Sequence, residues 1–203
     1  TETNGETSLF DVPLHYNFYN ASRDENYNLT QILDKTLMKE NPSKAVTFVD
    51  NHDTQPEQSL QSYVERWFKL PAYSIILLRD EGYPCVFYGD FYGIKHNNID
   101  KMEGLKEMIT IRKDKAYGKQ NDYFDNTNCI GWTREGDANH IKSGVAVLIS
   151  NKFDSEKRMY IGKDLVGEEF IDVIGNCEEK VIVDEEGFGI FKVKAKSVSV
   201  WIR

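Results

Sequence analysis

The sequence has 203 residues, of which 40% are hydrophobic and 12% aromatic, enough apolar side chain to bury a core and to exclude disorder as the main state. Its net charge of −8 at pH 7 repels phosphate backbones and anionic headgroups, so nucleic acids and membranes are poor partners. The longest apolar run, residues 73–78, is far shorter than the roughly 20 residues of a membrane span, and no cleavable signal opens the sequence.

Short apolar runs alternate with helical patterns in the first part of the sequence, which is typical of a parallel sheet built from strand–helix units. Strands are predicted at residues 9–14, 45–50 and 85–88. Their spacing of roughly 36 to 40 residues fits one strand, one helix and the loops between them. We therefore expect an α/β fold in this part.

Three helices are predicted between and after these strands. Apolar residues at helical spacing indicate a helix over residues 29–37, which ends before Pro42. The next helix is expected to start at about Glu57 and to meet Pro71, which must kink it or start a second segment. A short third helix is expected over residues 105–112.

The pattern changes at about residue 116, where short strands begin to follow one another with turn residues between them. This succession predicts an all-β module, an antiparallel sandwich of the Greek-key type. The strands are expected at residues 129–134, 145–150, 158–161, 169–173, 181–183, 190–193 and 198–202.

The three cysteines, Cys85, Cys129 and Cys177, are widely spaced and form no CxxC pair. No histidine lies near enough in sequence to complete a zinc site with them. We expect free thiols, a use of cysteine that favours the cytoplasm over secretion.

A polar cluster of Asn51, His52 and Asp53 follows the second predicted strand directly. In a barrel of parallel strands, side chains at the carboxyl end of a strand face the active-site mouth, so these residues are candidates for an active site. A carboxylate beside an imidazole can bind sugar hydroxyls or stabilise developing positive charge. The alternative is that residues 51–54 cap the next helix and that Gln58 closes the turn. Capping explains one or two of these residues and leaves the imidazole of His52 unexplained.

Four segments carry a resemblance to a known family. FVDNHD at residues 48–53 resembles the strand-seven motif of the α-amylases in glycoside hydrolase family thirteen. FDVPLHY at residues 10–16 and VFYGDFYG at residues 86–93 resemble strands six and eight of the liquefying bacterial amylases, and GWTREGD at residues 131–137 resembles the opening of their C-terminal β domain. The resemblance covers nearly the whole sequence.

The resemblance implies two domains and an activity. Residues 1–115 would be the C-terminal part of a catalytic (β/α)8 TIM barrel, strands six to eight, and residues 116–203 the C-terminal β-sandwich domain. The parent enzyme would hydrolyse internal α-1,4-glucosidic bonds of starch or glycogen with retention of configuration.

The same resemblance implies roles for four residues. Asp53 matches the third catalytic carboxylate, which grips sugar hydroxyls and helps distort the ring, and His52 matches the histidine that binds the same sugar. Gln58 and Asn51 are expected to line the substrate subsites. The nucleophile and the acid/base belong to strands four and five, outside these residues. The 203-residue fragment is therefore expected to be inactive without the missing N-terminal part of the barrel.

Calcium is expected in the parent enzyme, but the interdomain site near Tyr27, Asn128 and Asn151 is doubtful, because neutral amides replace the carboxylates that a hard cation prefers. No metal or cofactor is therefore expected in this fragment.

The alternative function is a non-catalytic carbohydrate-binding or structural module. Open barrel edges would also favour a homodimer.

Overall fold

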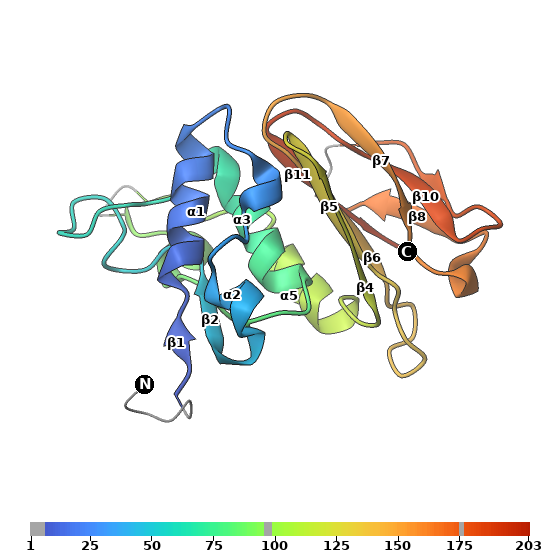
Figure 1. The fold of residues 1–203 in the computed structure, drawn as a ribbon, viewed down its shortest axis with the longest axis horizontal. Coiled ribbons are helices and arrows are strands. Elements are labelled where there is room, and N and C mark those ends of the chain that lie inside the picture. The colour runs from blue at the N-terminus through green and yellow to red at the C-terminus, as the bar shows by residue number, and fades with distance from the viewer. Residues whose placement is uncertain (1–6, 96–98, 175–176) are drawn as a thin grey trace.

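The computed structural model describes residues 7–95, 99–174 and 177–203 (Figure 1). Within these residues, helical elements alternate with three short strands up to residue 114, and eight further strands follow. In chain order the helices and strands are β1 (Leu9–Phe10), α1 (Val12–Arg23), α2 (Leu37–Glu40), β2 (Ala45–Phe48), α3 (Arg66–Leu78), β3 (Tyr83–Cys85), α4 (Tyr88–Tyr92), α5 (Leu105–Asp114), β4 (Gln120–Asn126), β5 (Cys129–Arg134), β6 (Val145–Ser150), β7 (Ser155–Tyr160), β8 (Glu169–Asp172), β9 (Val181–Ile182), β10 (Phe188–Val193) and β11 (Ser197–Ile202).

A parallel three-stranded sheet forms the centre of the first part. Its order is β1-β2-β3, with Leu9 opposite Ala45 and Val46 opposite Tyr83. The helices α1, α2 and α3 pack beside β2, which is the middle strand (Figure 1). The first part is therefore α/β, as predicted. None of the helices within the described ranges is long and apolar enough to cross a membrane.

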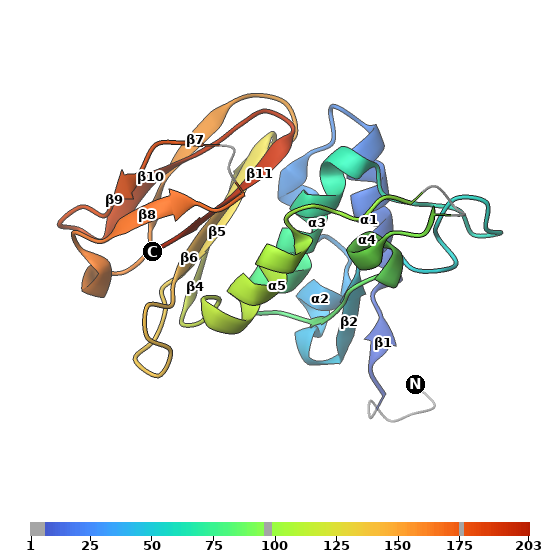
Figure 2. The ribbon, with the colours of Figure 1, turned by 180° about the vertical axis from the view of Figure 1, so that it is seen from behind.

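Two antiparallel sheets make up the second part. The larger has the order β4-β5-β6-β11-β8-β9, and β7 and β10 form a two-stranded sheet over one of its faces. Strand β6 is buried along its whole length, because both faces of the larger sheet are covered. Val147 points toward the helices, whereas Leu148 belongs to the core under β7 and β10. The molecule is thus layered, with the larger sheet between the helices and the smaller sheet (Figure 2).

One apolar core joins the two parts of the chain. Side chains of α3 and α5 share it with Ile130, Trp132 and Val200 of the larger sheet. The predicted division near residue 116 falls between the end of α5 and the start of β4. The division into two domains stays a prediction, since this core crosses it.

Two predicted strands are shifted relative to the structure. The strand expected over residues 9–14 ends at Phe10, because Asp11 caps α1 by accepting a hydrogen bond from the Leu14 amide (3.2 Å) and Pro13 suits the first helical turn. The strand expected over residues 85–88 is β3, two residues earlier, and α4 begins at Tyr88.

The helices expected over residues 29–37 and from Glu57 are also wrong in extent. Residues 29–37 hold only a 3-10 turn and the start of α2, because Lys35 has a φ of 59° that interrupts a helix. Glu57 has a φ of 69°, and α3 starts at Arg66 and runs through Pro71 as one helix. The third predicted helix is confirmed as α5.

The predicted β module is confirmed in nearly every strand. Strands β5 and β6 have the predicted bounds, and the other five predicted strands overlap β7 to β11. Strand β4 was not predicted, because its residues are mostly polar. It is an edge strand that pairs only with β5, so it needs little apolar surface.

Candidate functional site

The candidate site starts where β2 ends. Parallel strands bring their carboxyl ends to one edge of the sheet, and at this edge β2 leads through Val49 and Asp50 into a loop over residues 51–65. Asp50 is buried, whereas most of the loop is partly or fully exposed. The loop therefore has a fixed base and a solvent-facing tip.

A buried ionic cluster holds the base of the loop. The Nζ atom of Lys69 in α3 lies 2.9 Å from Oδ2 of Asp50 and also pairs with Asp90 of α4. The Tyr73 hydroxyl donates to Oδ2 of Asp90 at 2.7 Å. Lys69 and Tyr73 are four residues apart on α3, so they share one helical face and can both reach Asp90. We call Asp50, Lys69, Tyr73 and Asp90 the ionic cluster.

The charges of the ionic cluster shift its pKa values. Burial raises the pKa of Asp50 to about 6, although the charge of Lys69 opposes this rise. Burial alone would lower the pKa of Lys69, but the charges of Asp50 and Asp90 outweigh it and raise that pKa. Burial and the charge of Asp90 hold the pKa of Tyr73 well above its usual range, so the hydroxyl stays a donor. One cation thus serves two buried carboxylates.

Asp50 also ties down both ends of the loop. Its Oδ1 accepts a hydrogen bond from the Thr54 hydroxyl at 3.2 Å and another from the Val64 amide at 3.2 Å. The ionic cluster and the loop are therefore one hydrogen-bonded unit. This unit was not predicted from the sequence, where its one signal is the charged Lys69 within the apolar pattern of α3.

The predicted site residues Asn51, His52 and Asp53 lie at the start of this loop, directly after Asp50. The Oδ1 atom of Asn51 accepts hydrogen bonds from the amides of Asp53 (2.8 Å) and Thr54 (3.0 Å), which folds residues 51–54 into a tight turn. The side chains of His52 and Asp53 are 82% and 56% exposed, with 3.5 Å between Nε2 and Oδ1. The turn thus brings Asn51, His52 and Asp53 together and presents an imidazole and a carboxylate to solvent.

Gln58 lies further along the same loop and is exposed. No helix begins near it, so the alternative that residues 51–54 cap a helix closed by Gln58 is wrong. Asn51 caps the turn 51–54 instead, and the amide of Ser62 returns to the Thr54 carbonyl at 2.9 Å. These contacts within the loop replace the hydrogen bonds of a helix.

His15 of α1 supports the loop from below. Its ring is buried and stacks on Phe48 with the centroids 5.1 Å apart. Nδ1 lies 2.6 Å from the Val49 carbonyl and Nε2 lies 3.0 Å from the Ser62 hydroxyl. Burial lowers the pKa of His15, and a neutral ring with its proton on Nδ1 satisfies both contacts. His15 is therefore a structural residue.

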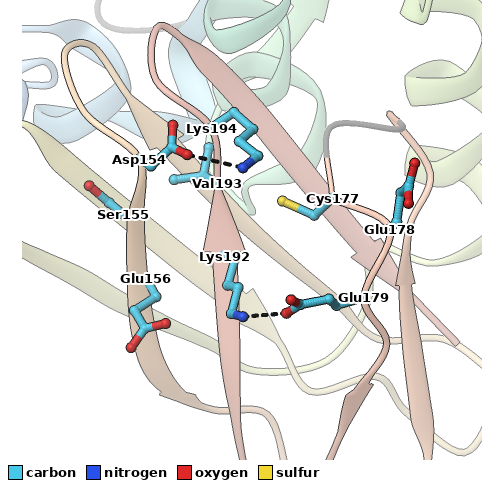
Figure 3. Close-up of a pocket in the computed structure, with 9 residues that line it drawn as sticks. All are labelled: Asp154, Ser155, Glu156, Cys177, Glu178, Glu179, Lys192, Val193 and Lys194. Atoms are coloured by element: carbon cyan, nitrogen blue, oxygen red, sulfur yellow. Dashed lines mark hydrogen bonds and ion pairs between the residues drawn. The ribbon is translucent and has the colours of Figure 1, made fainter.

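Two cavities are candidates for the functional site. A cavity of about 190 Å³ lies at the base of the loop, lined by Asp50, Lys69 and neighbouring side chains. A larger cavity of about 700 Å³ lies over β7 and β10. Figure 3 shows that charges cross this larger cavity in pairs, Lys194 with Asp154 (3.0 Å) and Lys192 with Glu179. Glu156 and Glu178 also line it, so its net charge is negative. We place the candidate site at the loop because the predicted site residues lie there.

The residues of the doubtful calcium site meet between the two parts of the chain. Nδ2 of Asn151 donates to the Tyr27 carbonyl at 2.8 Å, and Nδ2 of Asn128 donates to Oδ1 of Asn151 at 3.0 Å. Amide hydrogens thus occupy the oxygens that would face a cation. Tyr27, Asn128 and Asn151 thus join the two parts of the chain by hydrogen bonds.

Comparisons with known proteins find similar sequences and structures along the chain. The alpha-amylase C-terminal family matches residues 145–202. The α-amylase of Geobacillus stearothermophilus is 49% identical over 203 residues, covering 99% of this chain and 37% of that protein. The glucan 1,4-alpha-maltohexaosidase of Bacillus sp. (strain 707) is 47% identical, with 99% and 39% covered. The crystal structure of α-amylase I from Eisenia fetida has the same fold, with a TM-score of 0.68, 17% identity, and 95% and 48% covered.

The sequence matches thus run along almost the whole chain. The chain spans about two fifths of the length of the curated relatives, and it matches their C-terminal portion. Residues 145–202 belong to the alpha-amylase C-terminal family, and the chain as a whole corresponds to the C-terminal portion of the bacterial α-amylases.

Proposed function

We propose that this chain is part of an α-amylase that hydrolyses internal α-1,4-glucosidic bonds of starch or glycogen with retention. The observation that carries the proposal is the turn 51–54, which holds an exposed carboxylate and imidazole at the carboxyl end of a parallel strand. The relatives named above as an α-amylase and a maltohexaosidase support a glucan as the substrate. This activity belongs to the longer protein.

In this proposal, Asp53 stabilises the positive charge that develops on the sugar ring in the transition state. His52 and Asn51 contact the same sugar, and Gln58 lines a neighbouring subsite. The nucleophile and the acid/base come from residues outside this chain. Asp50 cannot replace them, since it is buried and committed to Lys69 and the loop.

We further propose that β1, β2 and β3 are an arc of a TIM barrel. Both edge strands support this, because Leu9, Phe10 and Tyr83 are exposed apolar side chains on strands with one unpaired edge. The preceding part of the barrel would cover these edges. In its absence, a second copy of the chain would cover them as a homodimer.

A chimera tests the role of Asp53. Residues 1–203 would replace the matching portion of the G. stearothermophilus α-amylase, and reducing sugar released from soluble starch would be measured. Asp53→Asn should lower kcat about 10²- to 10³-fold, the usual cost of removing one group that stabilises transition-state charge. Asp114→Asn, the same change at an exposed position at the end of α5, should leave kcat unchanged. Equal activity of the two variants would overturn the proposal.

The chain alone should release no reducing sugar from starch above a buffer blank. Measurable hydrolysis by the purified 203-residue chain would show that both missing catalytic groups are present within it. Binding to insoluble starch that survives the loss of Asp53 and His52 would instead favour the carbohydrate-binding module.

Two further proposals concern calcium and the cellular compartment. We propose that the Tyr27–Asn128–Asn151 network works without calcium, so the melting temperature of the chain should be the same in calcium and in EDTA. The three cysteines are free thiols, which supports a reducing compartment such as the cytoplasm.

A further inference from the structure

A cavity of about 460 Å³ lies where the ends of α3 and α5 meet β5. Four cations line it, Arg79, Arg112, Lys113 and Arg134, whereas Asp80 is the one carboxylate among its described lining residues. We call it the arginine cavity. Such a concentration of positive charge is unexpected in a chain with a net charge of −8.

The arginine cavity is separate from the candidate sugar site. Lys69 of the ionic cluster lies in the first turn of α3, whereas Arg79 directly follows its last residue, Leu78. Ten residues of helix separate the two by about 15 Å along the axis. The candidate mechanism therefore makes no use of these cations.

Two of the four cations are already neutralised. Arg79 is buried and binds Asp122 through both Nη atoms, at 2.8 and 2.9 Å, and its Nη2 also lies 3.0 Å from Glu81. Arg134 is buried too, and its Nη2 donates to Asp80 at 3.0 Å. Structural ion pairs thus account for the charge of Arg79 and Arg134.

Arg112 and Lys113 have no such partners. Within the described part of the chain, neither forms an ion pair with a carboxylate, and the side chain of Arg112 makes one hydrogen bond, from Nη1 to the Leu77 carbonyl at 2.6 Å. Arg112 is half-buried, so its charge has lost part of its hydration. Burial, and then the charge of Arg134, lower the pKa of Arg112. An anion bound in the cavity would compensate for the lost hydration of Arg112 and for its repulsion by Arg134.

We propose that the arginine cavity binds a small phosphate-bearing anion through Arg112 and Lys113. The guanidinium of Arg112 has donors left to grip two phosphate oxygens, and the Lys113 ammonium adds a mobile point charge. Ile109 and Ala116 supply apolar wall that a small organic group could contact. A cavity of this size takes a phosphate ion or a small phosphate monoester, whereas the overall charge of the chain disfavours a nucleic acid.

Calorimetric titration at constant ionic strength tests this proposal, with inorganic phosphate in one arm and glycerol 3-phosphate in the other. Both arms should saturate, and chloride should not compete at that ionic strength. Tighter binding of glycerol 3-phosphate would identify a monoester as the ligand, and equal binding would identify the phosphate group alone.

Two lysines of α5 provide a matched pair of variants. Lys113→Gln should weaken phosphate binding about fivefold, the effect of one partly exposed charge contact. Lys106→Gln removes the same charge from an exposed position of the same helix and should change nothing. Arg112→Gln should weaken binding about tenfold or more. The proposal is wrong if phosphate does not saturate, or if Lys113→Gln binds as tightly as Lys106→Gln.

Discussion

Replacing Lys69 by methionine should show how much the ionic cluster contributes to stability. The Lys69 side chain is 12% exposed and serves two carboxylates, Asp50 and Asp90, that are both buried. Removing one partner of a buried ion pair costs about 3–5 kcal/mol, because the remaining charge stays desolvated. Asp50 has a pKa of about 6, so it can take up a proton once the cation has gone. We therefore expect a loss at the low end of that range, about 3 kcal/mol at pH 7.

Urea unfolding followed by tryptophan fluorescence measures this loss. Lys106→Met is the matched control, since Lys106 is exposed on α5, and it should change the free energy of unfolding by less than about 0.5 kcal/mol. At pH 5 the loss from Lys69→Met should shrink, because Asp50 is then largely protonated. A loss below about 1 kcal/mol at pH 7, or the same loss at both pH values, would refute this account of the cluster.

Two further predictions concern stability. The folded pKa of Asp50 is about 6 against an ordinary 3.8, so the folded chain holds an extra proton between these values. The contribution of Asp50 to the free energy of unfolding is largest below pH 3.8 and falls by about 3 kcal/mol as the pH rises through 6. Asp50→Asn should remove this pH dependence, which urea midpoints measured across that range would show. Gly118→Ala should lower the free energy of unfolding by more than about 2 kcal/mol, since a Cβ there would lie 2.0 Å from the Gly136 carbonyl oxygen. Gly167 has a similar positive φ but open space, so Gly167→Ala should cost only about 1–2 kcal/mol in the same assay, and equal losses would contradict the steric argument.

The β module was the most predictable part of the fold. Residues 145–150 are apolar along a whole strand, and β6 has the predicted bounds because it is buried on both faces. Strand β4 escaped prediction since an edge strand keeps polar residues. Its pairing with β5 comes from backbone hydrogen bonds that leave no apolar pattern.

The first part was harder to predict because tertiary contacts set its local structure. The run after Glu57 has helical spacing, yet the amide of Val64 bonds to Asp50 and that of Glu65 bonds to Ser22, so the chain stays a loop. Asp11 likewise ends a predicted strand early by capping α1. Apolar periodicity alone cannot reveal such partners.

The candidate site, too, was predictable only in part. The motif at residues 48–53 marked Asn51, His52 and Asp53, and the structure brings these three together in one turn. The ionic cluster below them could not be predicted. Its members come from the segment that follows β2, from α3 and from α4, and only the fold brings Lys69 to Asp50 and Asp90.

A crystal structure of the chimera with a bound maltooligosaccharide would test the central claim most directly. The account predicts a glucose ring at the turn 51–54, with hydroxyls about 2.5–3.0 Å from the Asp53 carboxylate and about 3 Å from Nε2 of His52. A sugar bound elsewhere, for example over β7 and β10, with neither residue in contact, would contradict it.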